Sequence, residues 1–359
     1  MTSNSNRAPL RIGCAAGFWG DTETAARQLL ERGGLDYLVF DYLAEITMSI
    51  MAGARLRDPA RGYATDFVSR VLRDCLKLAV EQRVRIVTNA GGVNPLACRA
   101  ALLALAEQLG VSPRIAVVLG DDITSLHAEL AREGVREMFS GAPLPAAVLS
   151  ANAYFGAKPI AAALAAGADI VITGRIVDSA LVLGPLVHEF GCSWNDFDRL
   201  SQGSLAGHII ECGAQCTGGI FTDWESVPGY EDMGYPIVAC EPDGSFTVEK
   251  PAGTGGLITP AVVYEQLVYE IGDPRNYLLP DVICDFSRVT AVQVTTDRVR
   301  VTGATGRAPT DLYKVSATYP DGFRLAIGVL IGGEQAARKG ERVARALVDK
   351  VERLLEARG

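Results

Sequence analysis

Short apolar runs alternate with amphipathic stretches along the first two thirds of the chain. The runs are rich in Val, Ile, Leu and Ala, as is typical of parallel strands buried on both faces, and the stretches between them repeat apolar positions at helical spacing. This order predicts strand-helix-strand units around a mostly parallel sheet. The predicted strands are 11–16, 37–41, 84–88, 114–119 and 169–173, and the predicted helices are 21–32, 66–82, 95–109, 126–132, 159–166 and 176–190.

The pattern changes near residue 235 to β-branched and alternating segments separated by turn signals. The strands predicted there are 235–240, 245–249, 282–285, 290–295, 299–302, 314–319 and 323–330, and an amphipathic helix is predicted over 334–357. We therefore expect an α/β protein of two domains. Residues 10–230 are predicted to form a doubly wound, Rossmann-like domain with a mostly parallel sheet, and residues 231–359 a β-rich α+β domain that ends in a helix.

Composition excludes several classes of protein. Hydrophobic residues make up 48% of the 359-residue chain and charged ones 21%, which predicts a large core. The balance of 34 Lys and Arg against 42 Asp and Glu gives a net charge of -8, which disfavours nucleic acid as a partner. No apolar run is long enough to span a membrane, and residues 1–10 lack the apolar stretch of a secretory signal. Eight cysteines without a CxxC pair indicate free thiols, so we expect a cytoplasmic protein.

The first predicted strand runs into a glycine-rich stretch, Gly13–Gly20, and Asp41 ends the second strand. This placement is typical of dinucleotide-binding folds, in which glycines let a pyrophosphate approach a helix and an acid binds ribose. The glycine spacing differs from that fingerprint, however, and Asp21 stands where the phosphate would approach. Two interpretations remain: nicotinamide dinucleotide binding, or a glycine turn capped by Asp21.

Polar residues follow two other predicted strands. Asn89 and Asn94 lie in the segment TNAGGVNP, which opens a helix, and their amides are candidates to bind a carbonyl or phosphate oxygen. Asn94 equally fits a simple helix cap. Arg175 follows the strand 169–173 and is suited to clamp a carboxylate or phosphate, with Asp178 close behind it. The alternative for Arg175 is an internal ion pair with Asp178.

The segment 207–219, GHIIECGAQCTGG, combines three residue types that can act in catalysis or metal binding. In a helix, His208, Cys212 and Cys216 would share one face, but they would span about 12 Å and could not all reach one ion, so we expect no metal. Glu211 stands among apolar and small residues, where burial raises the pKa of a carboxyl toward that of a useful acid or base. The alternative is a Glu at a helix N-terminus, bonded to backbone amides.

A second glycine loop, KPAGTGG, begins at Lys250. Its amides could cradle an anion such as a phosphate of coenzyme A, although it lacks the order of a nucleoside-triphosphate loop. The glycines could also serve loop geometry alone. Because the chain holds only three histidines, acid-base chemistry is expected to rest on carboxylates, and the best placed are Asp41, Glu45, Asp178 and Glu211.

Six motifs in this order, GFWGDT, DYLVFDYLAEITM, TNAGGVNP, TGRIVDSALVLGPL, GHIIECGAQCTGG and KPAGTGGLIT, resemble the acyclic terpene utilisation AtuA-type family over residues 10 to 355. The resemblance implies a cytoplasmic protein linked to the breakdown of branched isoprenoid acids as coenzyme A thioesters. Longer relatives carry an extra C-terminal domain that this chain lacks.

Acyl thioesters typically undergo proton removal beside the carbonyl, hydration or carbon-carbon cleavage, and each of these steps needs an acid-base carboxylate and donors toward an enolate oxygen. We therefore expect a hydratase or lyase with Glu211 as the main acid-base group and Asp178 or Asp41 as its partner. The amides of 217–219 are further candidate donors. The substrate-binding candidates are Asn89, Asn94, Arg175, Gln215, Thr217, Gly218, Lys250, Thr254 and Gly255.

No cofactor is expected beyond coenzyme A as part of the substrate. The expected partner is a small-molecule substrate, and we expect a homo-oligomer, for which a homodimer is the commonest form. Two other classes stay open: an NAD(P)-dependent oxidoreductase, and a non-catalytic binding or assembly subunit.

Overall fold

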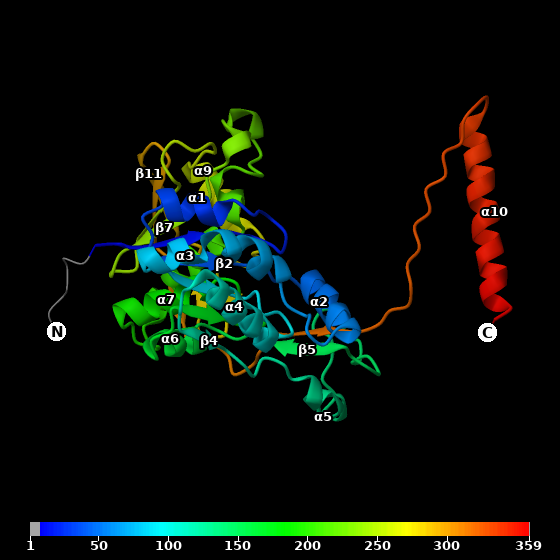
Figure 1. Ribbon diagram of the computed structural model, residues 1–359, viewed down its shortest axis with the longest axis horizontal. Helices are drawn as coiled ribbons and strands as arrows, with labels where there is room; N and C mark the ends of the chain where they lie inside the picture. The colour runs from blue at the N-terminus through cyan, green and yellow to red at the C-terminus, as the bar shows by residue number, and fades with distance from the viewer. Residues whose placement is uncertain (1–7, 359) are drawn as a thin grey trace. The chain divides into compact units, whose positions relative to one another are not determined.

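A nine-stranded mixed sheet forms the centre of the computed structural model, which describes residues 8–358 (Figure 1). The strand order is β11-β12-β8-β7-β1-β2-β3-β6-β4. The parallel strands are β1 (Leu10–Cys14), β2 (Tyr37–Phe40), β3 (Arg85–Thr88), β4 (Ile115–Val117) and β6 (Ile170–Ile172). The predicted α/β class is confirmed.

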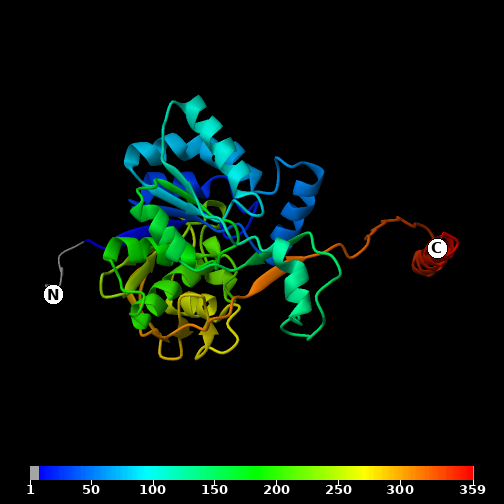
Figure 2. The same cartoon turned by 90° about the horizontal axis from the view of Figure 1, so that it is seen from below.

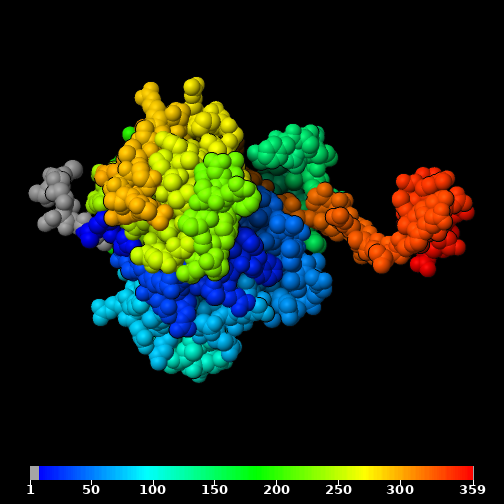
Figure 3. Space-filling model, turned by 90° about the horizontal axis from the view of Figure 1, so that it is seen from above, coloured from blue at the N-terminus to red at the C-terminus, as the bar shows by residue number. Residues whose placement is uncertain are grey.

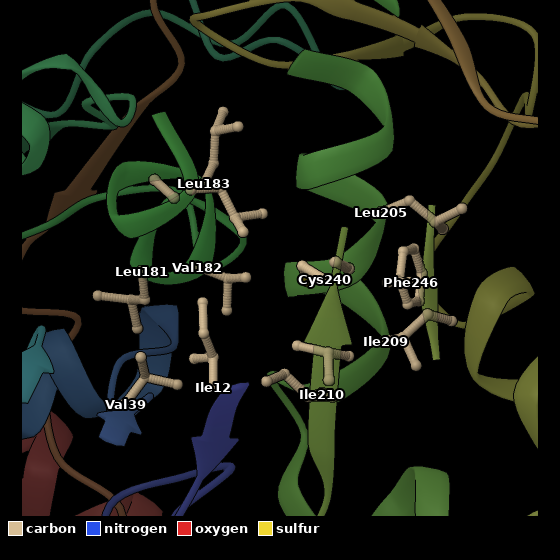
Figure 4. Close-up of a cluster of buried hydrophobic side chains, with 14 of the residues drawn as sticks. Ile12, Val39, Leu181, Val182, Leu183, Leu205, Ile209, Ile210, Cys240 and Phe246 are labelled. Carbon is tan, nitrogen blue, oxygen red and sulfur yellow. The ribbon is translucent and has the colours of Figure 1, made fainter. Parts of the chain in front are cut away.

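Helices cover both faces of the parallel strands, because successive side chains of a strand point to opposite faces. In β2, Leu38 and Phe40 face one core, whereas Tyr37 and Val39 face the other. Figure 2 shows cyan helices on one side of the sheet and green helices on the other. The first core contains α1 (Ala25–Arg32), the π-helix η1 (Phe67–Leu72), α3 (Arg73–Gln82) and α4 (Pro95–Leu109). The second contains α6 (Lys158–Ala165), α7 (Ala180–Phe190) and α8 (Phe197–Ile210), and Figure 4 shows part of it.

The sheet continues past residue 230, where the sequence predicts a domain boundary. β7 pairs antiparallel with β1, and the further antiparallel strands extend from it. One core joins Ile12 of β1 to Val299 and Val301 of β12. In the space-filling view the yellow and orange segments lie against the blue and green ones (Figure 3). The change in pattern near 230 therefore marks a change from parallel to antiparallel strands within one sheet. These strands are β7 (Ile237–Cys240), β8 (Phe246–Glu249), β11 (Thr290–Thr295) and β12 (Arg298–Thr302).

Smaller elements complete this unit, which ends at Pro320. Two small sheets pair β9 (Tyr277–Leu278) and β13 (Thr305–Arg307) with β10 (Ile283–Asp285), and β5 (Ser150–Ala153) with β14 (Val315–Thr318). The other elements are α2 (Glu45–Arg57), η2 (Thr124–Leu126), α5 (His127–Arg132), η3 (Gly213–Thr217), η4 (Trp224–Ser226), η5 (Tyr230–Asp232) and α9 (Pro260–Val268).

A second unit spans Asp321–Gly359. Its helix α10 (Ala336–Glu356) confirms the helix predicted over 334–357. The strand predicted over 323–330 does not form. An apolar run becomes a strand only when another strand supplies its backbone hydrogen bonds, and the described residues of this unit contain no second strand.

All eight cysteines are free thiols, as predicted. Within residues 8–358, no helix is both long and apolar enough to cross a membrane. The absence of a secretory signal is predicted from residues 1–10. Of these, residues 1–7 lie outside the described part of the chain.

Candidate active site

Three carboxylates gather at the carboxyl-terminal edge of the parallel strands. Asp41 follows β2 directly, Asp178 lies in the loop between β6 and α7, and Glu211 caps the C-terminal end of α8. Carboxylate oxygens of the three residues all lie within 4.8 Å of one another. Asp41 is 5% exposed and Glu211 9%, whereas the side chain of Asp178 is 29% exposed. The structure thus brings together the three residues predicted to be catalytic; their role in catalysis remains a prediction.

Two glycines bring Glu211 to this edge. Gly17, in the loop after β1, lies so close to Cys212 that a Cβ at Gly17 would stand 2.5 Å from the carbonyl carbon of Cys212. Gly207 on α8 approaches the backbone of Ser179, the residue before α7, in the same way. Because neither glycine has a side chain, the end of α8 can pack against both loops, and this places Glu211 beside Asp178 and Asp41.

Asn89 orients Asp41. Its Nδ2 donates to Asp41 Oδ1 at 2.6 Å, and its Oδ1 accepts from the amide of Tyr42 at 2.7 Å. Burial raises the pKa of Asp41 well above its usual value, the charges of Asp178 and Glu211 raise it further, and Asn89 only partly offsets them. Asn89 is fully buried, so its observed contact is with Asp41; a contact with substrate stays a prediction.

Arg175 pairs with Asp178, as the second interpretation of Arg175 predicts. Its Nη2 lies 3.3 Å from Asp178 Oδ1, and its Nη1 donates to the carbonyl of Leu43 at 2.6 Å. Burial raises the pKa of Asp178, Arg175 opposes the rise, and the charge of Glu211 adds to it, so that the pKa reaches about 7. The predicted helix 176–190 begins only at Ala180, because Ile176 is extended and bridges to Phe155.

Sequence reasoning missed the residues that hold Arg175. Its guanidinium carbon lies 4.1 Å from the centre of the Tyr154 ring, and its amide donates to Asp121 at 2.8 Å. Tyr154 in turn donates to Glu45 at 2.6 Å, and Lys314 contacts the same carboxylate at 3.0 Å. Asp121 stands just beyond β4 at the same sheet edge, which is a signal that sequence could have used. Tyr154 follows β5 outside the main sheet and gives no such signal.

Glu211 hydrogen-bonds to a histidine. Oε1 of Glu211 lies 3.1 Å from Nδ1 of His208, which is itself buried. The alternative predicted for Glu211, a helix N-terminus bonded to backbone amides, is wrong, since the residue caps the opposite end of α8. The negative end of the helix dipole lies there and disfavours an unpaired carboxylate. The contact with His208 is therefore needed to stabilise a carboxylate at Glu211.

Metal binding by His208, Cys212 and Cys216 has no geometric support among the described residues. His208 contacts Glu211, whereas the thiol of Cys216 faces the carbonyl of Gly213 at 3.7 Å. Within residues 8–358 the carboxylate cluster is the one place where three side chains of metal-binding type lie close enough to share an ion. We assign no metal to the cluster, because Arg175 already places positive charge beside it. A metal-free site remains a prediction.

Asn94 caps a helix. Its Oδ1 accepts from the amide of Ala97 at 3.4 Å, and its Nδ2 donates to the carbonyls of Pro59 and Arg61 at 2.9 and 2.7 Å. The capping interpretation of Asn94 is therefore confirmed. Its side-chain donors bind backbone, which leaves the oxyanion role predicted for Asn94 without support.

The backbone amides of 217–219 are predicted to bind an oxyanion. In the structure, amides of this segment donate to carbonyls of η3. Gly218 donates to the carbonyl of Gln215 at 3.3 Å, and Gly219 to that of Ala214 at 2.9 Å. The hydroxyl of Thr217 lies 2.7 Å from the carbonyl of Gly234. These donors hold the turn together, so the predicted oxyanion contacts of Thr217 and Gly218 are not supported. Within residues 8–358, no hydrogen bond places the side chain of Gln215.

The loop that begins at Lys250 is also satisfied internally. Nζ of Lys250 lies 3.0 Å from Asp297 Oδ2 and 2.9 Å from the carbonyl of Thr254. The hydroxyl of Thr254 donates to Pro251, and the amide of Gly255 to Asp232, both at 2.7 Å. These contacts agree with the second interpretation of the loop, in which its glycines serve loop geometry alone. They do not support an anion site at this loop.

The loop after β1 likewise fits the capped-turn interpretation. The amide of Gly17 donates to Asp21 at 3.0 Å, and burial raises the pKa of Asp21. The space beside Gly17 is filled by the backbone of Cys212, where a dinucleotide fold would admit a pyrophosphate. Asp41, the expected ribose ligand, faces Asn89 instead.

A family model described as acyclic terpene utilisation family protein AtuA matches residues 10–358. Comparisons with curated proteins and with solved structures gave no match.

Proposed function

Because the chain belongs to the acyclic terpene utilisation AtuA family, we propose that it is an enzyme acting on a branched acyl-CoA thioester or a related carboxylated carbonyl compound. Family membership links the chain to the use of acyclic terpenes; the substrate and the reaction are our inference. The observation that carries the proposal is the cluster of Asp41, Asp178 and Glu211 with Arg175 beside it. We assign hydratase or lyase chemistry to this cluster.

The cluster offers a proton donor and a proton acceptor side by side. Asp41 and Asp178 have raised pKa values, which favour their protonated forms near neutral pH. In hydration of an enoyl thioester, the oxygen of a water molecule bonds to the β-carbon while one carboxylate takes a proton from that water. A carboxylic acid gives a proton to the α-carbon. The site ends with the same number of protons on different oxygens. Arg175 stabilises the ionised form of Asp178 as that charge develops.

The first test is ligand binding by the full chain. A thermal-shift panel compares coenzyme A, branched enoyl and hydroxyacyl thioesters, NAD(H) and NADP(H). A ligand at about 100 times its dissociation constant stabilises a protein by roughly 2.7 kcal/mol. We expect shifts with thioesters alone. A shift with NAD(H) or NADP(H) alone would favour the oxidoreductase, and no shift with any compound would favour a non-catalytic subunit.

The second test measures turnover of the thioester that binds. Replacing Glu211 by Gln keeps its shape but removes its acid-base function, and we expect activity to fall by about 10²- to 10⁴-fold. Glu107→Gln is the matched control, because Glu107 is an exposed residue of α4 and lies outside the cluster. An E211Q variant with wild-type activity would refute the acid-base role assigned to Glu211.

We place the enzyme in the cytoplasm as a homo-oligomer that needs no cofactor beyond the coenzyme A of its substrate. Eight free thiols agree with a reducing compartment. Sedimentation of the full chain tests the oligomeric state.

A further inference from the structure

His208 engages both of its ring nitrogens inside the protein. Its side chain is 1% exposed. Nε2 lies 3.2 Å from the carbonyl oxygen of Leu267 on α9, and Nδ1 lies 3.1 Å from Oε1 of Glu211. The backbone carbonyl of His208 accepts from Gln266 at 3.1 Å, so α9 holds both the ring and its backbone.

These two contacts determine where the protons are. A carbonyl oxygen only accepts hydrogen bonds, so Nε2 of His208 must carry a hydrogen toward Leu267. A neutral imidazole with its hydrogen on Nε2 presents a bare lone pair at Nδ1. A carboxylate oxygen of Glu211 3.1 Å away is also an acceptor, so a second proton must lie between Nδ1 and Oε1.

The surroundings decide which atom holds that second proton. His208 lies in the last turn of α8, where the helix dipole favours a cation. Burial alone lowers the pKa of His208, but the charge and hydrogen bond of Glu211, together with the carbonyl of Leu267, outweigh burial and raise it. The rings of Phe286 and Tyr277 lie beside the imidazole, with centroids 6.5 and 6.0 Å away.

Other ionisable groups surround the pair from every neighbouring element. Raised pKa values favour the neutral forms of four of them, and Arg175 is engaged by Leu43 and Asp178, so the carboxylate of Glu211 at 3.1 Å decides the charge of the ring. The surrounding groups are Asp41 after β2, Arg175 and Asp178 before α7, Cys212 after α8, Glu270 after α9 and Tyr277 on β9.

We propose that His208 is an imidazolium that holds Glu211 ionised, so that Glu211 is the proton acceptor of the cluster while Asp41 and Asp178 carry the protons to be donated. The assignment rests on the proposed function, and it divides the acid and base roles by environment. His208 is thus a positioning residue that acts through Glu211. Because Oε1 of Glu211 is engaged by His208, Oε2 is the atom assigned to take the proton.

The proton on His208 is directly observable by nitrogen NMR of the full chain labelled with ¹⁵N-histidine. The spectrum contains three histidines, and the signal absent from H208Q identifies His208. We expect both ring nitrogens of His208 to be protonated at pH 7.5. In E211Q the ring should change to the neutral form with its hydrogen on Nε2. A neutral His208 in the wild type, or an imidazolium unaffected by E211Q, would overturn the proposal.

Activity gives the second readout. If H208Q folds, its kcat should fall by about tenfold or more with KM unchanged, because Glu211 has lost the cation that positions it. An unchanged kcat contradicts the role. The NMR result does not depend on turnover, so failure of every thioester assay would refute the proposed reaction and leave the state of His208 measured.

Discussion

Gly207 on α8 lies directly against Ser179, with a space between them too small for a methyl group. A Cβ at Gly207 would stand 2.5 Å from the carbonyl oxygen of Ser179. Ser179 is the neighbour of Asp178, and Gly207 is one turn before Glu211. The close approach of the Gly207 and Ser179 backbones therefore determines how far apart the carboxylates of Glu211 and Asp178 lie.

Replacing Gly207 by Ala should destabilise the protein by about 1–3 kcal/mol, because the backbone it meets cannot rotate away. Urea denaturation measures the loss. Gly53→Ala is the control: Gly53 is inside α2 with no atom within 4 Å of its Cβ position, so this change should stabilise by about 0.5–1 kcal/mol. Equal stability of G207A and the wild type would show that α8 can shift freely.

Replacing Arg175 by Lys should also destabilise the protein, although the charge is kept. Lys lacks the fork that reaches both the carbonyl of Leu43 and Asp178, and a buried acceptor left unpaired costs about 1–3 kcal/mol. Arg114→Lys is the matched control, since Arg114 pairs with Asp169 at an exposed site and should change stability by less than about 1 kcal/mol. An R175K protein as stable as R114K would contradict the structural role.

The raised pKa of Asp178, about 7, makes stability depend on pH. An ordinary Asp in the unfolded chain loses its proton near pH 4, whereas the folded protein keeps it until about pH 7. The stability contributed by the protonated form is therefore complete below pH 4 and is lost as the pH rises to 7. Replacing Asp178 by Asn removes this loss, so D178N should gain stability relative to the wild type between pH 5 and pH 8.

Asp285 provides the control for that measurement. Hydrogen bonds from the hydroxyl and the amide of Ser287 lower the pKa of Asp285. Its contribution is lost only as the pH falls below about 4, so the effect of D285N on unfolding should be the same at pH 5 and pH 8. A D178N difference that also stays constant would refute the pKa assigned to Asp178.

Lys250 should matter for stability and not for binding coenzyme A. Its side chain is 5% exposed and its ammonium group pairs with Asp297, so Lys250→Met should cost about 1–3 kcal/mol through loss of that contact. Lys77→Met, at an exposed pair with Glu81, should cost less than about 1 kcal/mol. Titration by calorimetry checks the second part: weaker coenzyme A binding in K250M alone would restore the anion site at this loop.

The sequence by itself determined the strands and the polar residues at their ends. Leu38, Phe40, Tyr37 and Val39 are apolar at every position because β2 is buried on both faces, and this pattern is local. Parallel strands end at one edge, so Asp41 and the loop of Arg175 could be placed together from sequence alone. The apolar neighbours of Glu211 could single it out as an acid-base candidate.

Only the tertiary structure decided which of these residues meet and which donors are free. Glu211 reaches Asp41 through backbone contacts at Gly17 and Gly207, which no local pattern reveals. The donors of Asn94 and Lys250 are consumed by carbonyls and a carboxylate far along the chain. β7 joins β1 for the same reason: a strand's hydrogen bonds depend on a partner that lies more than 200 residues away in sequence. Local propensity predicts an element, whereas its partners are selected by the packing of the whole fold.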